Sequence, residues 1–355
     1  MPKPLNAIDL FASCGGLSEG LKMAGFNVIA ANEIVHDAAM TYKVNHPSTK
    51  MIEKDIRMLS AKEIIDTARD RISIVAGGPP CQGFSMAGRR DLNDPRNFLF
   101  REFIRVVEKL SPKYFLMENV PGMLSIGKGK FFSSIISSFE EIGYKATSVL
   151  LDSSHFGVPQ IRKRVFITGS NKKLNPAEIK SVKRKPVCVK DAIGDLDFLD
   201  NGEHATSYLK LPETEYQKKM RWNSTKLFNH QSSNHSKDTI KRFAFLMQGQ
   251  SISDLPIKLR TRKFALYRLD GRRPSKTLTT LPDDYVHYEK NRILTVREMA
   301  RLQSFPDSYI FLGPRTTGGV RRRTSAPQYT QVGNAVPPLL AKTVGEWILG
   351  TENLK

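Results

Sequence analysis

The sequence has few cysteines and no long apolar run. Its three cysteines, Cys14, Cys81 and Cys188, lie far apart and lack the paired spacing of a zinc site or a disulfide framework. We therefore expect reduced thiols and no bound metal. No stretch approaches the roughly 18 consecutive apolar residues of a membrane span. The first residues, MPKPLNAIDLFAS, lack the long apolar core of a secretion signal. These absences predict a cytoplasmic protein without a membrane partner.

Acidic residues are also scarce relative to basic ones. The 355 residues include 55 Lys and Arg but only 35 Asp and Glu, which gives a formal net charge of +20. Such a balance favours a polyanionic partner. Nucleic acid is the first candidate, and an acidic membrane surface is the second.

Two textures follow one another along the chain. From residue 5 to 170, short apolar runs alternate with helical segments, which is typical of a parallel α/β sheet. Residues 171–325 are polar, basic and weakly periodic. We therefore predict one domain from residues 1–170 plus 326–355 and a second domain from residues 171–325. The expected strands are residues 5–11, 27–33, 72–78, 114–120, 146–152 and 164–170, and amphipathic helices are expected at 98–110 and 339–349, the last packing back on the first domain.

A glycine-containing turn follows the first expected strand, in the segment DLFASCGGLSEG at residues 9–20. In an open α/β sheet, ligands bind where such turns leave the carboxyl ends of the strands. Glu33 and Asp55 each follow an expected strand, where they are placed to hydrogen-bond ribose hydroxyls and an adenine amino group. The pattern predicts a nucleoside-type cofactor. The alternative is that Gly15 and Gly16 only permit tight packing of a helix on a strand.

The segment GGPPCQGFS, residues 77–85, places a single cysteine behind two prolines in a loop after an apolar run. Pro79 and Pro80 stiffen the approach to Cys81, and the flanking glycines leave room for a ligand. A thiol is a useful nucleophile only as the thiolate, which needs cationic or hydrogen-bond-donating surroundings. The segment predicts a nucleophile. A structural cysteine in a strand-end turn is the alternative.

An acidic residue ends a later apolar strand. The segment MENVPGM, residues 117–123, carries Glu118 and Asn119 where the strand stops. A buried carboxyl group at that place is suited to donate a proton to a ring nitrogen of a bound base. The alternative is that Glu118 pairs with an arginine in a structural network.

A basic segment, VPQIRKRVF at residues 158–166, alternates like a strand. The alternation predicts that Gln160, Arg162 and Arg164 lie on one face. Two guanidinium groups on one face form a fixed donor surface for a ligand. The alternative is an edge strand with a solvated basic face.

Taken together and in this order, these segments resemble the motifs of the DNA (cytosine-5)-methyltransferases. DLFASCGG resembles the cofactor loop of that family, GGPPCQGFS the nucleophile loop, ENV the acid strand and QIRKR the base-contacting strand. RILTVREMARLQSFPD (292–307) and QVGNAVPPLLA (331–341) resemble the last two motifs. One departure is Ser13, where the family usually has glycine. The resemblance implies an α/β fold: a Rossmann-like S-adenosylmethionine-dependent methyltransferase domain with a smaller, mostly irregular or β target-recognition domain.

The resemblance also implies a reaction and its residues. A methyl group would pass from S-adenosylmethionine to carbon 5 of a cytosine flipped out of duplex DNA, leaving S-adenosylhomocysteine. Cys81 would add to carbon 6, Glu118 would protonate ring nitrogen 3, Arg164 would hold the exocyclic oxygen, and Arg162 would position the loop of Cys81. The implied cofactor residues are Phe11, Gly15, Gly16, Glu33, Asp55, Ile56, Pro79, Leu99 and Asn334. The implied DNA-binding residues are Gln82, Ser85, Gln160, Thr277 and Leu278.

Three basic stretches are further candidates for contacts with DNA phosphates, and they are Lys180–Lys190, Lys258–Arg273 and Arg321–Arg323. Charge runs of this kind are more often solvated faces. We expect a monomeric bacterial modification enzyme at the nucleoid, with a cognate restriction endonuclease as its candidate counterpart in the cell.

Other functions fit part of these features. The same fold acting on transfer RNA is one, although the long basic second region favours duplex DNA. A DNA-binding regulator that senses S-adenosylmethionine without turnover is another, but it would not need Cys81, Glu118 and both arginines together. A dinucleotide-dependent oxidoreductase would be expected to carry a GxGxxG pattern, which the sequence lacks.

Overall fold

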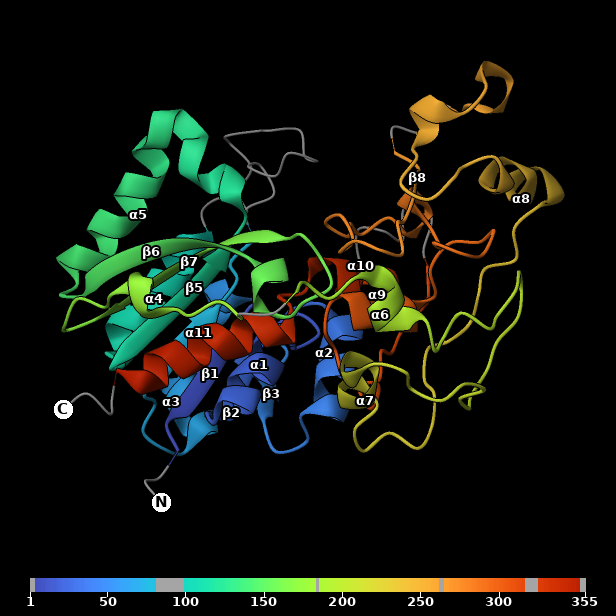
Figure 1. Cartoon of the computed structure of the whole chain (residues 1–355). Helices are drawn as coiled ribbons and strands as arrows, with labels where there is room; N and C mark the ends of the chain where they lie inside the picture. The colour runs from blue at the N-terminus through green and yellow to red at the C-terminus, as the bar shows by residue number, and fades with distance from the viewer. Residues whose placement is uncertain (1–3, 81–98, 183–184, 262–264, 317–324, 352–355) are drawn as a thin grey trace. The chain divides into compact units, whose positions relative to one another are not determined.

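The structure, a computed structural model, describes residues 4–80, 99–182, 185–261, 265–316 and 325–351 (Figure 1). The chain divides into two compact units. The first comprises Met1–Asp152, Lys163–Ser181 and Leu340–Lys355, and the second comprises Ser153–Arg162 and Val182–Leu339. The predicted functional division at residues 170 and 325 stays a prediction, because packing units do not test which segment binds a cofactor or DNA.

A seven-stranded sheet forms the centre of the first unit, in the order β3-β2-β1-β4-β5-β7-β6. Strands β1 to β5 pair in parallel, and β7 runs antiparallel to both of its neighbours, β5 and β6. The predicted α/β sheet is therefore confirmed, but the expectation that it is parallel throughout is wrong at β7. The short β3 is the strand that the periodicity did not predict. The bounds are β1 Asn6–Leu10, β2 Asn27–Asn32, β3 Lys50–Ile52, β4 Ile74–Gly77, β5 Tyr114–Asn119, β6 Lys145–Asp152 and β7 Lys163–Ser170.

Helices pack on this sheet around an aromatic core. Phe115 of β5 stacks on Phe139 of α5 with ring centroids 3.8 Å apart, and Phe103 of α4 meets Phe139 edge to face. The amphipathic helix predicted at 98–110 is confirmed as α4, which buries Phe100, Phe103, Val106 and Val107. The helices are α1 Gly16–Ala24, α2 His36–Asn45, α3 Ala61–Ala68, α4 Leu99–Leu110 and α5 Lys130–Glu141, with short 3-10 turns at Ile56–Met58, Pro121–Gly129 and Pro176–Glu178.

The last helix, α11 (Pro338–Gly350), packs back on the first unit as predicted. A Cβ atom added at Gly345 would come within 2.8 Å of the Ala24 Cβ and 3.3 Å of the Leu21 side chain, so α11 lies directly against α1. The indole nitrogen of Trp347 donates to the Asn175 carbonyl oxygen at 3.2 Å. The glycine in this helix therefore permits the close approach of the two helices.

The predicted strand at 158–166 is wrong in its first half. β7 begins at Lys163, and before it Gln160 makes only a single bridge, to Ser275. Gln160 and Arg162 therefore belong to the second unit and Arg164 to the first. The alternation is therefore not that of one continuous strand, and the polar groups of Gln160 and Arg162 bind backbone atoms of the second unit.

The second unit is mostly irregular, as predicted, and its regular elements are short. Its helices are α6 Val189–Ile193, α7 Glu215–Met220, α8 Lys237–Ala244, α9 Val296–Leu302 and α10 Gln328–Asn334. Its strands are β8 Tyr267–Arg268 and β9 Tyr285–Val286, and its 3-10 turns are η5 Ser153–Phe156, η7 Ile252–Asp254, η8 Ile257–Leu259 and η9 Pro282–Asp284.

A buried network of charges holds the second unit together around α9, every residue of which is buried. Arg292 binds both carboxylate oxygens of Glu298, at 2.7 and 2.8 Å. Arg301 joins Asp195 and Asp307, each at 2.6 Å. Although burial alone would raise it, the ion pair with Arg292 lowers the pKa of Glu298 to about 2. The charged residues of the segment RILTVREMARLQSFPD therefore form a polar core, which explains their spacing without any contact to a ligand.

Replacing the two glycines before the prolines of GGPPCQGFS by alanine is expected to change the stability of the fold by different amounts. A Cβ atom at Gly77, in β4, would lie 2.4 Å from the Leu10 carbonyl oxygen, whereas one at Gly78 would meet nothing closer than a side-chain oxygen of Glu118 at 3.2 Å. We expect Gly77→Ala to lower the free energy of unfolding by about 1–3 kcal/mol, because the backbone of β1 must move. Urea denaturation followed by circular dichroism measures this, with Gly78→Ala as the matched control. An equal loss of unfolding free energy in both variants would show that the contact of position 77 with the Leu10 carbonyl oxygen is not responsible.

Candidate active site

Glu118 and Arg164 form an ion pair at the carboxyl end of β5. Because β7 runs antiparallel to β5, Asn119 at the end of β5 pairs with Val165 near the start of β7. The start of β7, which carries Arg164, therefore lies beside the end of β5. The Glu118 Oε1 and Arg164 Nε atoms are 2.8 Å apart, and the two side chains are only 12% and 11% exposed. Burial lowers the pKa of the Arg164 guanidinium, and the Glu118 carboxylate raises it. An arginine stays charged throughout the physiological range, so the pair offers donors and a carboxyl group side by side.

Asn119 fixes the chain just before the predicted nucleophile. Its buried side-chain amide donates to the Pro79 carbonyl oxygen at 3.1 Å, and its Oδ1 accepts the Val120 amide at 2.9 Å. Gly78 has no side chain where a Cβ atom would lie 3.2 Å from the Glu118 Oε2 atom. The end of β5 therefore holds both the acid and the start of the loop. Cys81, Gln82 and Ser85, which the sequence predicts for catalysis and DNA binding, lie outside the described residues.

Neither of the cysteines that the structure describes has the character of a nucleophile. Cys14 is completely buried, and burial raises the pKa of its thiol to about 12. Burial also raises the pKa of the half-buried Cys188. A reactive thiol needs a lowered pKa. Neither thiol is therefore activated by its surroundings.

The turn after β1 has an unusual backbone that one glutamate holds. Phe11, Ser13 and Gly15 have positive φ angles of 58°, 49° and 92°. Such values favour glycine. Ser13, which stands where the family motif usually has glycine, therefore carries a cost in conformational strain. The Glu33 carboxylate, which is 8% exposed, accepts the Ser13, Ile34 and Val35 amides at 2.8 Å each.

Burial raises the pKa of Glu33, and these three backbone donors lower it. A carboxylate has about four acceptor positions, so Glu33 can accept one further donor from a ligand. Gly15 precedes the first residue of α1, Gly16, and its amide donates to the Ala12 carbonyl oxygen at 2.8 Å. The turn and Glu33 therefore form a preorganised cradle beside the sheet.

Asp9 is a buried acid beneath this turn that the sequence reasoning missed. Only 1% exposed, it accepts the Ser18 hydroxyl at 2.7 Å, and the Ser18 hydroxyl oxygen lies 2.7 Å from the Tyr42 hydroxyl oxygen. Burial raises the pKa of Asp9 to about 7. The signal was available: an aspartate in the middle of an otherwise apolar strand, NAIDL.

Three other predicted cofactor residues lie along the first unit. Asp55 caps the turn at Ile56–Met58 by accepting the Arg57 amide at 2.9 Å, and its bonds to the Arg57 side chain lower its pKa. Ile56 is buried, and its carbonyl oxygen accepts Arg105 at 2.9 Å. Leu99 begins α4 and packs partly buried against the main core.

The predicted site residues of the second unit meet at one buried junction. Arg162, 1% exposed, donates to the carbonyl oxygens of Leu278, Gly333 and Ala335 at 3.0, 2.8 and 3.2 Å. The buried Gln160 accepts the Leu278 amide at 2.8 Å. Three sequence motifs are thereby joined. Thr277 and Asn334 are exposed at this junction, and the Thr277 hydroxyl donates to the Ile161 carbonyl oxygen at 2.7 Å.

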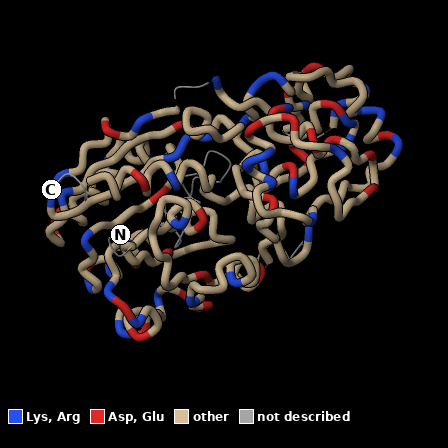
Figure 2. The backbone as a smooth tube through the Cα atoms, turned by 60° about the horizontal axis from the view of Figure 1, so that its bottom comes forward, with Lys and Arg blue, Asp and Glu red and all other residues tan. Residues whose placement is uncertain are grey.

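Two of the basic stretches converge in the second unit. The Val189 amide donates to the Arg273 carbonyl oxygen and the Lys190 amide to that of Gly271, both at 2.9 Å. The side chains of Arg272 and Arg273 are 86% and 81% exposed, and both face Asp270. Figure 2 shows basic residues, in blue, at many places along the backbone. Arg321–Arg323 lie outside the described residues.

Within the described ranges, no cluster of three or more His, Cys, Asp or Glu side chains is arranged to hold a metal ion. The helices that the structure describes include none with the length and apolar character needed to cross a membrane.

Comparison with known proteins gives consistent matches over nearly the whole chain. The family model for C-5 cytosine-specific DNA methylases matches residues 5–350. The chain is 39% identical over 369 residues to the Type II methyltransferase M.DdeI of Desulfomicrobium norvegicum, covering 97% of this chain and 88% of that protein. It is 37% identical over 354 residues to the Type II methyltransferase M1.HphI of Haemophilus parahaemolyticus, covering 97% and 87%.

Solved structures share the fold. A crystal structure described as a DNA modification methyltransferase encoded within a prophage of E. coli matches with a TM-score of 0.81 and 28% identity, covering 98% of this chain and 99% of that one. The S. pombe Dnmt2 methyltransferase matches with a TM-score of 0.62 and 18% identity, covering 99% of each chain, which shows the fold alone. The predicted α/β fold is confirmed.

Asp9 predicts how stability depends on pH. In the folded chain Asp9 keeps its proton up to about pH 7, whereas its ordinary pKa is 3.8. Folding therefore binds a proton between these values, and the Asp9 contribution to the free energy of unfolding falls as pH rises from about 4 to 7. We expect Asp9→Asn, which keeps an acceptor for Ser18, to remove this decline. Urea denaturation of both proteins at pH 5 and pH 8 tests it: a parallel pH dependence in the two proteins would show that Asp9 is not responsible.

Proposed function

Because the chain belongs to the C-5 cytosine-specific DNA methylase family, we propose that it methylates carbon 5 of a cytosine extruded from duplex DNA, through a covalent Cys81 adduct. The observation that carries this proposal is the arrangement at the end of β5, where Glu118 pairs with Arg164 and Asn119 binds the Pro79 carbonyl oxygen. One strand end thus serves the acid, the base-holding arginine and the approach to the thiol.

The chemistry explains why these residue types occur together. Carbon 5 of cytosine is too electron-poor to accept a methyl group unaided, and covalent addition of the Cys81 thiolate to carbon 6 supplies electron density. Ring nitrogen 3 and the exocyclic oxygen are adjacent acceptors, so both protein groups must donate. Glu118, once protonated, donates to nitrogen 3, and Arg164 donates to the oxygen. The 2.8 Å between these two side chains allows one pyrimidine edge to meet both.

The cradle of the first unit suits the cofactor S-adenosylmethionine, which supplies the methyl group when it is bound. Glu33 would accept a ribose hydroxyl with its remaining acceptor position. The positive φ angles at Phe11 and Gly15 shape the turn that would contact the rest of the molecule. We assign the same role to Gly16, Asp55, Ile56, Pro79, Leu99 and Asn334, in line with the family motifs. Removal of the carbon 5 proton by a base and departure of the Cys81 thiolate from carbon 6 would then leave 5-methylcytosine and S-adenosylhomocysteine, and no metal is required.

The thiol and the acid cannot reach a base inside a duplex, so the target base must leave the stack at a cost of a few kcal/mol. Contacts with DNA offset that cost. We assign them to Gln82, Ser85, Gln160, Thr277 and Leu278 and to the basic stretches. Gln160 and Leu278 are buried, so they would act by shaping the segment that carries the exposed Thr277. Residues 171–325 are proposed as the target-recognition domain, and residues 1–170 plus 326–355 as the catalytic and cofactor-binding domain.

The cellular setting follows from the substrate. We propose a monomer that acts on DNA in the cytoplasm, at the nucleoid. A cognate restriction endonuclease is the proposed counterpart in the cell, because the named relatives are Type II methyltransferases.

The proposal predicts methyl transfer that depends on one thiol. With radiolabelled S-adenosylmethionine, we expect label on duplex DNA, none on transfer RNA, and loss of at least about a thousandfold in rate for Cys81→Ser, because an alcohol is a far weaker nucleophile than a thiolate. Cys188→Ser is the matched control and should keep the wild-type rate. Label on transfer RNA alone would refute the DNA substrate, and label on neither would favour a sensor of S-adenosylmethionine.

A further inference from the structure

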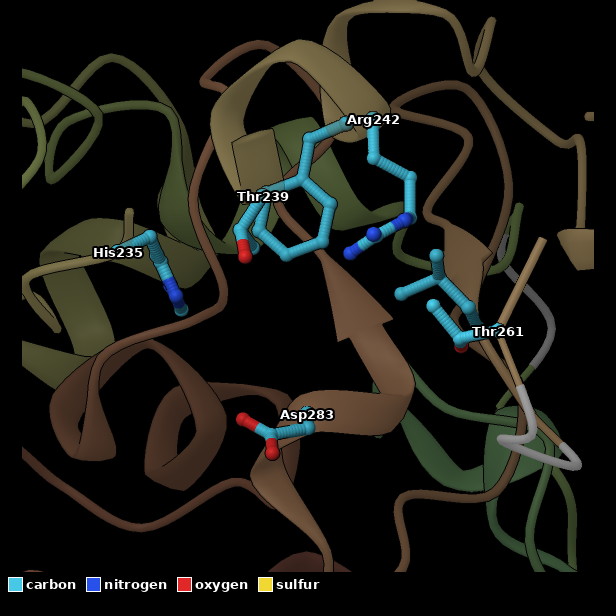
Figure 3. Close-up of a pocket in the computed structure, with 7 residues that line it drawn as sticks. His235, Thr239, Arg242, Thr261 and Asp283 are labelled. Carbon is cyan, nitrogen blue, oxygen red and sulfur yellow. The ribbon is translucent and has the colours of Figure 1, made fainter. Parts of the chain in front are cut away.

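The second unit has a pocket whose ionisable lining residues are His235, Arg242 and Asp283 (Figure 3). Each of these residues already has a partner. The Arg242 Nε donates to the Leu259 carbonyl oxygen at 2.8 Å, the His235 Nε2 accepts the Ile293 amide at 3.3 Å, and Asp283 also interacts with a neighbour. The charges of this pocket are therefore satisfied within the fold, and they do not identify a ligand.

In the first unit, Arg105 of α4 binds the backbone of a segment that carries two of the assigned cofactor residues. Its Nη2 donates to the Ile56 and Leu59 carbonyl oxygens at 2.9 and 3.0 Å. Its Nε donates to the Glu102 Oε2 atom at 2.7 Å, one turn earlier in the same helix. The Arg105 and Glu102 side chains are only 33% and 25% exposed. One guanidinium group thus joins α4 to the 3-10 turn at Ile56–Met58.

Donation to two backbone carbonyl oxygens distinguishes Arg105 from an ordinary helix ion pair. A Glu–Arg pair one turn apart contributes little to stability by itself. Hydrogen bonds from a charged donor are stronger than those between neutral groups, and the planar guanidinium group fixes their directions. A lysine would supply the charge without this fixed set of donors. Arg105 therefore restrains the position of the turn relative to α4.

The restrained turn carries Asp55 at its start. Asp55 caps the turn by accepting the Arg57 amide at 2.9 Å. Ile56 and Leu59 are 3% and 1% exposed and belong to the same core as Phe103 of α4, so the turn is anchored by apolar contacts as well. The Asp55 side chain remains 23% exposed. The place of its carboxylate is therefore set by the turn that Arg105 holds.

The Asp55 carboxylate can exchange its partner in the fold for a ligand. It binds the Arg57 side chain, which is 64% exposed. Exposed ion pairs are worth little, because water solvates both charges. An adenine amino group can therefore replace the Arg57 side chain at this carboxylate. The 6-oxo group of hypoxanthine is an acceptor, and a carboxylate would repel it.

We propose that Arg105 is a positioning residue that sets the selectivity of the cofactor site for adenine. It does not touch the cofactor, but holds the turn so that the Asp55 carboxylate meets the adenine amino group. This inference rests on the proposed function, from which it takes S-adenosylmethionine as the cofactor and Asp55 as the acceptor of the amino group. A purely structural residue would change the binding of all purine ligands alike, whereas Arg105 should change their ratio.

Isothermal titration calorimetry of the full chain with S-adenosylhomocysteine and with its hypoxanthine analogue, S-inosylhomocysteine, measures this selectivity. Arg105→Met removes the donors, and Arg105→Lys keeps the charge. Lys109→Met is the matched control, because it removes an exposed cation from the last turn of the same helix. Thermal denaturation verifies the folding of each variant, and fluorescence anisotropy measures its affinity for duplex DNA.

We expect the wild-type chain to prefer S-adenosylhomocysteine by about a hundredfold or more, because a site built around a hydrogen bond rejects an analogue that cannot make it. Both Arg105 variants should lose about tenfold or more of this ratio. The KM for S-adenosylmethionine should rise with kcat nearly unchanged, as expected for lost binding. The affinity for DNA should stay the same, and Lys109→Met should keep the wild-type ratio.

An unchanged ratio in both Arg105 variants, equal weakening of both ligands, or an equal loss in the control would overturn the inference. So would a wild-type chain that binds the two ligands equally. If Arg105→Met does not fold, the ratio in Arg105→Lys decides. A wild-type chain that binds neither ligand and transfers no methyl group to DNA would instead refute the proposed function.

Discussion

The antiparallel pairing of β7 with β5 is the constraint on which the candidate site depends. The antiparallel direction of β7 brings Arg164 beside Glu118, which lies one residue before the end of β5. The same strand end supplies Asn119, which binds the Pro79 carbonyl oxygen two residues before Cys81. An acid, a guanidinium group and the approach to a thiol are thus anchored to neighbouring strands of one sheet, which holds them more precisely than independent loops would.

Much of the charge that marks this family's motifs has a structural role in the present chain. The arginines and acids around α9 neutralise one another in the interior of the second unit. Breaking one partner of such a network leaves an uncompensated buried charge, which costs several kcal/mol. Arg162 also has a structural role, although it has no carboxylate partner among these contacts: it binds three carbonyl oxygens from two separate segments. A motif residue is therefore not by itself a contact with the substrate.

Sequence patterns predicted the strands well where burial dictates composition. The strands expected at 5–11, 72–78 and 114–120 correspond to β1, β4 and β5, each of which ends one residue earlier than expected. The alternation in VPQIRKRVF wrongly predicted one strand over residues 158–166. Alternation depends on which side chains are buried, and it does not indicate which other segment they pack against. Asp9 and the positive φ angles at Phe11 and Ser13 were not predicted, since they depend on contacts with Ser18 and Glu33 that are distant in sequence. Glu118 and Arg164 were singled out from their motifs, and the structure shows that their side chains form an ion pair.

We propose that the thiol of Cys81 joins carbon 6 of a cytosine that Glu118 and Arg164 hold. A duplex with 5-fluorocytosine at the target position tests this most directly, because fluorine cannot leave as a proton does and the adduct should persist. We predict a denaturation-resistant complex whose mass equals chain plus methylated duplex strand, formed by the wild-type enzyme and not by Cys81→Ser. Enzyme that methylates ordinary DNA yet forms no such complex would contradict the covalent route.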